Sequence, residues 1–184
     1  GKIDAVVDGG PCQVGVESTI VDLTCDPPRL LRPGGMPLEA LEEVVGPLTV
    51  DKAVTEPLKD GEQPKAPGMK YRHYAPKADL KIVEGPVEKV VAYINEKAKA
   101  GKVGIICTEE TKDCYPAGDV KCIGSRKSEL SIASHLFAVL REFDEDGVDA
   151  IYSESFQAPG LGEAIMNRLL KAAGHQRVDV SDRI

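Results

Sequence analysis

The fold is decided by residues 80–107, which read LKIVEGPVEKVVAYINEKAKAGKVGIIC. Residues 80–83 and 103–107 are short aliphatic runs rich in β-branched side chains, a composition typical of buried strands. Between them, residues 87–100 have helical spacing, with one apolar stripe formed by Val90, Val91 and Ile94. A strand, a helix and a strand in this order predict a βαβ unit, whose right-handed crossover makes the two strands parallel.

The same alternation continues toward the C-terminus. Further strands are expected at residues 120–123, 148–152 and 177–180, and further helices at residues 131–143 and 162–173. Parallel strands joined by helices form sheets that are covered on both faces. We therefore predict an α/β fold in which residues 78–184 form a Rossmann-like three-layer domain with a mainly parallel sheet.

The N-terminal part has shorter elements. Residues 3–7 are a β-branched run that predicts a strand, and residues 17–23 and 29–31 predict a hairpin. Residues 37–45 have helical spacing with acidic side chains on the outer face, and Pro37 suits the first turn of a helix. We assign residues 1–51 to a separate domain portion.

The stretch between the two parts, residues 52–77, is a long linker that ends in APGMKYRHYAP at residues 66–76. Its clustered cations and phenols are Lys70, Arg72 and His73, and Tyr71 and Tyr74. The cations suit an anion, and the phenols can stack on a planar group or donate a hydroxyl. Composition equally allows a semi-rigid spacer whose tyrosines pack on a neighbouring domain.

Composition excludes some functional classes. A net charge of −7 argues against a surface built throughout for nucleic acid, so any RNA contact requires a local basic patch such as residues 70–73. No apolar run approaches the ~20 residues that span a bilayer, which excludes a membrane partner and favours the cytoplasm. The five cysteines lack the spacing of a zinc site and are expected to be reduced thiols, with Cys107 buried.

Three polar residues near the N-terminus are candidates for a phosphate site. Ser18 and Thr19 place adjacent hydroxyls where a strand begins, and Arg32 ends a strand before a Pro-Gly-Gly turn. Hydroxyls and a guanidinium fork are good phosphate ligands. Each also has an ordinary interpretation, because a Ser-Thr pair often bonds across strands and an isolated arginine is usually a solvated charge.

Four motifs in order carry a resemblance to a known family: VGVESTIVDLT at 14–24, LRPGG at 31–35, APGMKYRHYAP at 66–76 and GLGEAIMNRL at 160–169. They resemble the two-domain L-threonylcarbamoyladenylate synthase family. The family's upstream Lys-x-Arg and Ser-x-Asn elements do not occur at matching places before Val14. The chain therefore resembles the C-terminal part of such an enzyme and is expected to be inactive or nearly so by itself.

The resemblance implies an organisation and an activity. Residues 1–51 would be the rear of a YrdC-like catalytic domain, residues 52–77 a linker and lid, and residues 78–184 the Rossmann-like C-terminal domain. The parent enzyme would be a nucleotidyltransferase that joins L-threonine, bicarbonate and ATP into threonylcarbamoyl-AMP plus pyrophosphate, for the threonylcarbamoyladenosine modification of tRNA. Mg²⁺ would be carried on the ATP phosphates rather than by a metal site of the protein, and tRNA or tRNA-modification proteins are possible partners.

The resemblance also implies site residues. Ser18 and Thr19 would contact the nucleotide phosphates, Val14 would lie beside the nucleotide, and Arg32 would contact ATP. The lid residues would be Tyr71 and His73, with Arg72 and Tyr74 as further candidates. No residue is expected to be a covalent or acid–base catalyst, since positioning and charge stabilisation would carry the reaction.

Two other functions remain open from the residues alone. Residues 78–180 suit a non-catalytic Rossmann-like module that binds a partner or regulates a neighbour. Residues 70–73 suit RNA binding, which would depend steeply on salt. Gly160 and Gly162 form only part of a glycine-rich phosphate loop, and Glu154 with Ser155 lies where α/β sheets bind ligands but lacks a catalytic set.

Overall fold

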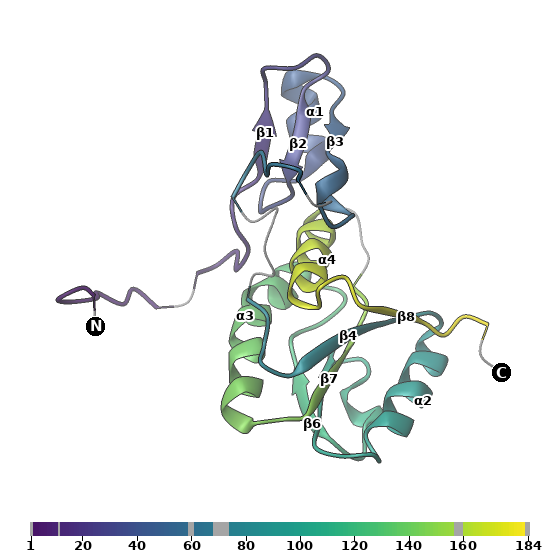
Figure 1. Cartoon of the computed structure of the whole chain (residues 1–184). Helices are drawn as coiled ribbons and strands as arrows, with labels where there is room; N and C mark the ends of the chain where they lie inside the picture. Colours follow the sequence, from purple (N-terminus) through teal and green to yellow (C-terminus); the bar gives the residue numbers. More distant parts are fainter. Residues whose placement is uncertain (1, 11, 59–60, 68–73, 157–159, 183–184) are drawn as a thin grey trace.

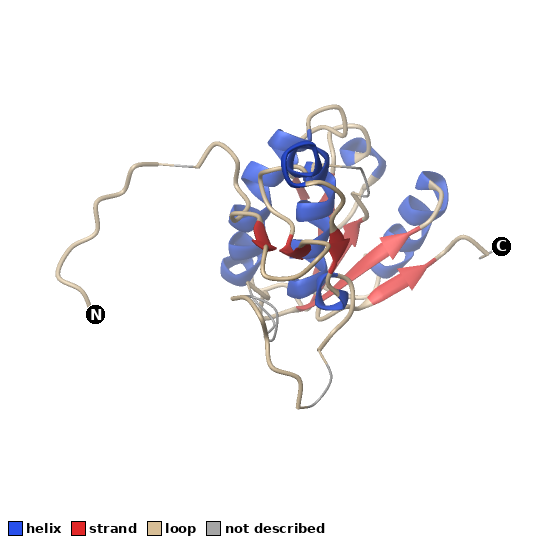
Figure 2. Cartoon of the chain, turned by 90° about the horizontal axis from the view of Figure 1, so that it is seen from above, coloured by secondary structure: helices blue, strands red, loops and turns tan. Residues whose placement is uncertain are grey.

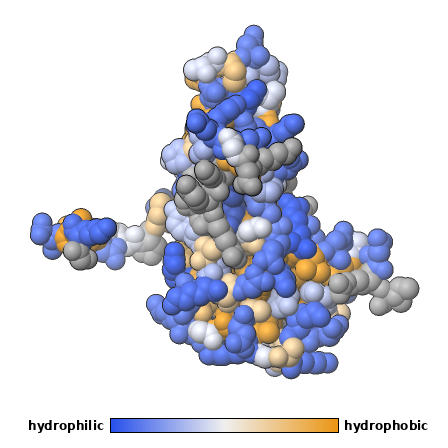
Figure 3. Space-filling view, viewed as in Figure 1, coloured by the Kyte–Doolittle hydropathy of each residue, from blue (hydrophilic) through white to orange (hydrophobic). Residues whose placement is uncertain are grey.

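The computed structural model describes residues 2–10, 12–58, 61–67, 74–156 and 160–182. A narrow part built from a small sheet and one helix stands on a wider α/β base (Figure 1). Hydrophilic side chains cover much of the face seen in Figure 3. Within the described ranges, no helix combines the length and apolar character needed to cross a bilayer.

The base contains a five-stranded sheet with strand order β6-β5-β7-β4-β8. Its strands are β4 (Asp79–Glu84), β5 (Val103–Cys107), β6 (Asp119–Cys122), β7 (Ala150–Glu154) and β8 (Arg177–Asp179). Every neighbouring pair runs parallel. The predicted α/β class with a mainly parallel sheet is confirmed.

Helices cover both faces of this sheet (Figure 2). Helix α2 (Val87–Lys97) packs on one face, whereas α3 (Glu129–Asp146) and α4 (Leu161–Ala172) pack on the other. The alternation of side chains along β4 produces the two cores, because Ile82 joins the cluster with α3 and α4 while Val83 joins the cluster with α2. Full burial of such side chains stabilises the fold by about 1.5–3 kcal/mol each.

The narrow part holds a three-stranded sheet with strand order β1-β2-β3. Its elements are β1 (Ile20–Asp22), β2 (Arg29–Arg32), α1 (Leu38–Val45), β3 (Thr49–Val50) and the short 3-10 helix η1 (Lys52–Val54); a second, η2 (Lys112–Cys114), lies in the base. Strands β1 and β2 pair antiparallel, as the predicted hairpin requires, and β3 runs parallel to β2. The predicted helix begins directly after Pro37, whose φ of −61° is compatible with a helix start.

The strand predicted at residues 3–7 is wrong. This segment projects away from the rest of the molecule (Figures 1 and 2) and has no strand assignment. Ile3 is 71% exposed and Val7 is 97% exposed. β-branched side chains favour a strand only where a neighbouring strand completes the hydrogen bonds and covers the side chains, and the described residues provide neither here.

Helix α4 connects the two parts. The Asn167 amide donates to the Val54 carbonyl at 2.6 Å, and the Lys171 ammonium donates to the Ala53 carbonyl at 3.0 Å. Both acceptors belong to η1, so these side chains satisfy carbonyl groups at the end of a short helix. The narrow part is thereby held on the base by polar contacts from one helix.

Candidate functional site

Arg32, at the end of β2, contacts both the start of the hairpin and the linker. Its Nε donates a hydrogen bond to the Ser18 carbonyl at 3.0 Å, and its Nη1 makes a longer contact of 3.5 Å with the Pro67 carbonyl. Ser18 is exposed and Arg32 is half-buried. The structure therefore brings Ser18 and Arg32 together, next to the point where the basic linker motif begins.

Thr19 holds the turn that follows β2. Its hydroxyl donates to the Met36 carbonyl at 2.9 Å and accepts a hydrogen bond from the Met36 amide at 3.1 Å. Gly34 lies so close to the other side of the hairpin that a Cβ there would overlap the Glu17 carbonyl oxygen and the Thr19 nitrogen. The hydroxyl pair and the Pro-Gly-Gly turn thus form one packed unit.

Val14 lies against the same turn. Its Cγ1 would be 2.7 Å from a Cβ on Gly35, and its side chain is 36% exposed. The next residue, Gly15, has φ of +70° and passes directly over the backbone of Ala133 in α3. This crossing fixes the entry to the hairpin against the base. The nucleotide-binding roles of Val14, Ser18, Thr19 and Arg32 stay predictions.

Of the four candidate lid residues, Tyr71, Arg72 and His73 lie outside the described residues. Tyr74 is described and has φ of +58°, which is uncommon for a residue with a side chain. Its ring meets the Phe137 ring edge-on, with centroids 4.4 Å apart and an interplanar angle of 64°. This contact agrees with the alternative in which a linker tyrosine packs on the neighbouring domain.

An ion pair that the sequence analysis missed joins the two parts. The Arg168 guanidinium of α4 contacts the carboxylate of Glu17. Glu17 directly precedes Ser18 and Thr19 in the sequence. Burial lowers the pKa of Arg168 to about 10, so the guanidinium still carries its charge at neutral pH. The available signal was an arginine on the apolar face of the helix 162–173, since a buried arginine requires a partner.

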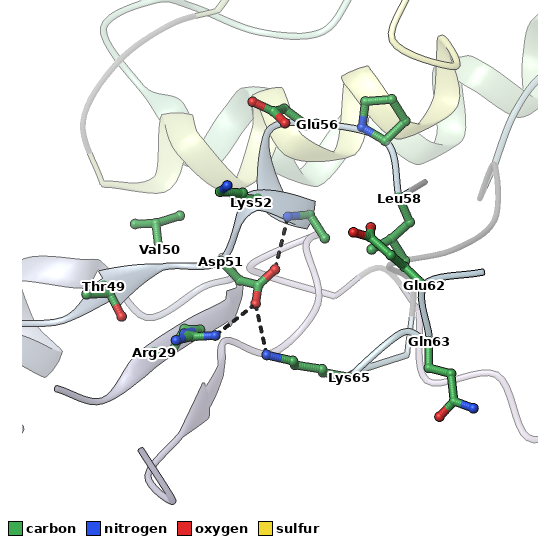
Figure 4. A pocket seen from close by; sticks show the side chains of 12 residues that line it. Arg29, Thr49, Val50, Asp51, Lys52, Glu56, Leu58, Glu62, Gln63 and Lys65 are labelled. Atoms are coloured by element: carbon green, nitrogen blue, oxygen red, sulfur yellow. Dashed lines mark hydrogen bonds and ion pairs between the residues drawn. The ribbon is translucent and has the colours of Figure 1, made fainter. Parts of the chain in front are cut away.

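A cavity of about 540 Å³ lies between β3, η1 and the first half of the linker (Figure 4). Asp51 accepts from the Ala53 amide at 3.0 Å and forms ion pairs with Arg29 at 3.7 Å and Lys65 at 3.6 Å. Ser18, Thr19 and Arg32 do not line this cavity. This cavity and the predicted phosphate site are therefore separate features.

The polar cluster at the C-terminal end of β7 is internally paired. Glu154 is buried and accepts hydrogen bonds from Thr111, from the Tyr115 hydroxyl at 2.8 Å and from Arg126 at 2.6 Å. Burial, followed by the charge of Glu154, raises the pKa of Tyr115. These contacts satisfy the carboxylate and fix three loops at the carboxyl edge of the sheet.

Metal ligation has little support from side-chain geometry. In the part of the chain that the structure describes, no group of three or more His, Cys, Asp or Glu side chains is arranged to hold a metal ion. Helix α1 has no buried side chain, and its Glu42 carboxylate accepts a hydrogen bond from the Leu48 amide at 3.0 Å.

The fold and these contacts define the class of the protein. It is an α/β protein in which a Rossmann-like domain is joined, through one helix and a linker, to a small sheet bearing hydroxyls and an arginine. A family model described as "Threonylcarbamoyl-AMP synthase, C-terminal domain" matches residues 36–174, and one described as "Telomere recombination" matches residues 1–34. The chain belongs to the threonylcarbamoyl-AMP synthase C-terminal domain family.

Two curated relatives are similar over nearly the whole chain. The threonylcarbamoyl-AMP synthase of Bacillus subtilis is 48% identical over 175 residues, which make up 95% of this chain and 50% of the relative. That of Pyrococcus abyssi is 46% identical over 185 residues, covering 98% of this chain and 52% of the relative. The chain spans about half the length of the curated relatives it matches.

Two solved structures of a relative also match over nearly the whole of this chain. The crystal structure of P. abyssi Sua5 complexed with L-threonine has a TM-score of 0.85 and 44% identity, and covers 97% of this chain and 52% of that chain. A variant of P. abyssi Sua5 with a histidine and the next tyrosine changed to alanine has a TM-score of 0.84 and 43% identity, covering 96% of this chain and 50% of that one.

Proposed function

We propose that this chain is the part of a threonylcarbamoyl-AMP synthase that comprises the rear of the catalytic domain, residues 1–51, the linker, residues 52–77, and the C-terminal domain, residues 78–184. The whole enzyme would convert L-threonine, bicarbonate and ATP into threonylcarbamoyl-AMP, pyrophosphate and water, with Mg²⁺ on the ATP phosphates. The product would serve the threonylcarbamoyl modification of adenosine in tRNA, so tRNA or tRNA-modification proteins are the proposed partners downstream.

The observation that carries this proposal is the position of Arg32. Its guanidinium bonds the Ser18 carbonyl and contacts the Pro67 carbonyl, so it lies between the hydroxyl pair and the linker motif. A planar guanidinium is suited to phosphate oxygens. Exposed Ser18 and half-buried Arg32 are in place to receive a nucleotide phosphate that approaches this edge of the hairpin.

Catalysis at such a site would consist of positioning and charge stabilisation. A mixed anhydride with AMP forms when the carboxylate of N-carboxylated threonine attacks the α-phosphate of ATP and pyrophosphate leaves. Negative charge then develops on the phosphate oxygens. Preorganised donors such as Arg32, Ser18 and Thr19 would stabilise that charge and hold the reactants in line. Val14 would contact the nucleotide beside the phosphates.

The linker motif would cover the bound substrates. The P. abyssi variant whose structure is known alters an adjacent histidine and tyrosine. This chain contains one such pair, His73 and Tyr74, and we propose that they act with Tyr71 and Arg72. A cover over the site would exclude water, to which a mixed anhydride is sensitive.

A chimera tests the proposal. This chain would replace the matching segment of the B. subtilis synthase, to which it is 48% identical, and threonine-dependent pyrophosphate release from ATP would be measured. We expect the chimera to be active. We expect Arg32→Ala in the chimera to lower kcat by about 10²–10³, the usual cost of losing one charge-stabilising donor.

Arg29→Ala is the matched control, because Arg29 begins the strand β2 that Arg32 ends and faces Asp51 instead of Ser18. Its kcat should stay within a few-fold of the unmodified chimera. A folded chimera that releases no pyrophosphate would contradict the proposed function. Equal losses in the two arginine variants would contradict the role of Arg32.

A further inference from the structure

Arg168 contacts two segments that lie far apart in the sequence. It is 7% exposed, and its guanidinium forms an ion pair with the Glu17 carboxylate. The same guanidinium lies 4.9 Å from the centroid of the Tyr74 ring. One side chain of the Rossmann-like domain therefore contacts the residue before the Ser18–Thr19 pair and the end of the described linker.

An arginine can make both contacts at once. The guanidinium pairs with the carboxylate, and its central carbon lies within cation–π distance of the Tyr74 ring. Phe137 of α3 completes the site, with its centroid 5.0 Å from the guanidinium carbon and 4.4 Å from the Tyr74 centroid. A lysine would keep the charge but lose the planar face.

The geometry makes the two contacts interdependent. Arg168 stands on α4, which is anchored in the core by neighbours such as Ile165 and Leu169, both fully buried. The guanidinium has little free space, so a displacement of Glu17 must be accompanied by a shift of the guanidinium and hence of Tyr74. Within the described residues, the Nε of Arg168 has no hydrogen-bond partner.

We propose that Arg168 is a positioning residue that couples the strand entry carrying Ser18 and Thr19 to the end of the linker at Tyr74. This inference rests on the proposed function for its significance, because those segments would border the nucleotide. It assigns a task to the Rossmann-like domain: the domain sets the relative position of two parts of the site. A shift at either segment is passed to the other through the one charged side chain that contacts both.

A double-mutant cycle tests the coupling without any nucleotide. The chain would be labelled with 3-fluorotyrosine, which gives ¹⁹F signals for its five tyrosines, and Tyr74→Phe would identify the signal of Tyr74. We expect Glu17→Gln to shift the Tyr74 signal, because the guanidinium relaxes when the carboxylate charge is lost. In the Arg168→Met background, Glu17→Gln should leave the Tyr74 signal unmoved.

Lys171→Met is the matched control, since Lys171 lies one turn further along α4 and bonds the Ala53 carbonyl instead of Glu17. In that background the response of Tyr74 to Glu17→Gln should be retained. A loss of packing alone would affect both backgrounds, so the cycle distinguishes coupling from general stability. Equal responses with and without Arg168, or no response in the native background, would overturn the proposal.

Arg168→Lys keeps the test valid if Arg168→Met does not fold. The lysine can pair with Glu17 but cannot stack as a plane on Tyr74, so the response should fall by at least half. A full response in Arg168→Lys would overturn the proposal. The cycle reports on coupling even if the chimera releases no pyrophosphate, so failure of the proposed function and failure of this inference are distinct results.

In the active chimera, Arg168→Lys should raise the KM for ATP severalfold and leave the melting temperature within a few degrees. A residue that only stabilises the fold would instead lower the melting temperature and the amount of active enzyme at an unchanged KM. An unchanged KM would contradict a positioning role at the nucleotide site.

Discussion

Gly34 leaves space for the backbone of the hairpin, because a Cβ at this position would overlap the Glu17 carbonyl and the Thr19 nitrogen. Backbone atoms cannot move aside to relieve this overlap as the end of a flexible side chain could. We expect Gly34→Ala to lower the free energy of unfolding by about 1–3 kcal/mol, the typical cost of overpacking. Denaturant unfolding monitored by circular dichroism measures the change.

Gly9→Ala is the control for this substitution, because nothing lies within 4 Å of a Cβ at Gly9. Its unfolding midpoint should match that of the unmodified chain. If Gly34→Ala were equally neutral, the tight approach of the Pro-Gly-Gly turn to the hydroxyl pair would be refuted.

Glu110 carries a pH dependence that its hydrogen bonds explain. The Ser125 hydroxyl donates to its carboxylate at 2.6 Å and the Arg126 amide donates at 3.0 Å. Chiefly through Ser125, the pKa of Glu110 falls from 4.5 to about 2. A carboxylate with a lowered pKa stabilises the fold above its unfolded pKa, and that contribution is lost as the pH falls through the folded pKa.

We therefore expect Glu110→Gln to flatten the decline of stability between about pH 4.5 and pH 2. The measurement is urea unfolding at a series of pH values in this range. Glu109→Gln, at the neighbouring position, keeps these hydrogen bonds and should retain the full decline. If the free energy of unfolding fell equally with pH in Glu110→Gln and in the unmodified chain, the two hydrogen bonds would not favour the ionised form of Glu110.

At the scale of elements, α4 serves as the connection between the two parts. Asn167 donates to the Val54 carbonyl at 2.6 Å, at the end of η1. Removing this bond by Asn167→Ala should cost about 0.5–1.5 kcal/mol, the usual net contribution of a hydrogen bond. It should also increase amide hydrogen exchange in residues 52–56, because the η1 turn loses its anchor.

Asn95→Ala provides a matched control for this prediction. Asn95 donates to the Cys114 carbonyl at 2.9 Å, which is a similar contact between a side-chain amide and a backbone carbonyl, but within the base. Exchange in residues 52–56 should not change in this variant. If the two variants affected η1 equally, α4 would not be the element that holds the narrow part.

At the scale of the whole molecule, the chain covers about half of its curated relatives, 50% of the B. subtilis protein and 52% of the P. abyssi protein. The Lys-x-Arg and Ser-x-Asn elements that the resemblance implies do not occur at matching places before Val14. We expect the 184-residue chain alone to show no threonine-dependent exchange between ATP and pyrophosphate. In the proposed function, Arg32 and the hydroxyl pair would supply only part of the donors that a triphosphate requires.

The measurement is exchange of labelled pyrophosphate into ATP, with the whole B. subtilis synthase as the positive control. Exchange by the 184-residue chain above the level of an Arg32→Ala variant would show that the elements before Val14 are dispensable.

Local patterns were sufficient for much of the base. The uninterrupted apolar run at residues 103–107 predicted a buried strand with Cys107 inside, and Cys107 is fully buried with its pKa raised to about 12 by burial. Periodicity fails where an element depends on a distant partner. Residues 3–7 have the composition of a strand, yet Val7 is 97% exposed because nothing in the described structure pairs with this segment.

Motifs could nominate the site but could not place it. Ser18, Thr19 and Arg32 were identified from their order and from the resemblance, whereas the pairing of Glu17 with Arg168 was missed. Residues 17 and 168 are far apart in the chain, and the sequence contains no signal that pairs one carboxylate with one guanidinium. The lid role of Tyr74 stays a prediction, and its contacts with Phe137 and Arg168 appear only in three dimensions.

The sequence by itself determined the alternation of strands and helices in the base, its parallel sheet and the motifs that mark the family, since these follow from residue type and short-range spacing. Only the tertiary structure decided that α4 holds the narrow part and that Arg168 joins Glu17 to Tyr74. A buried guanidinium is costly in free energy unless a carboxylate pairs with its charge, and contact with an aromatic ring stabilises it further. Which ones it finds depends on how the chain packs, and packing is a property of the whole fold.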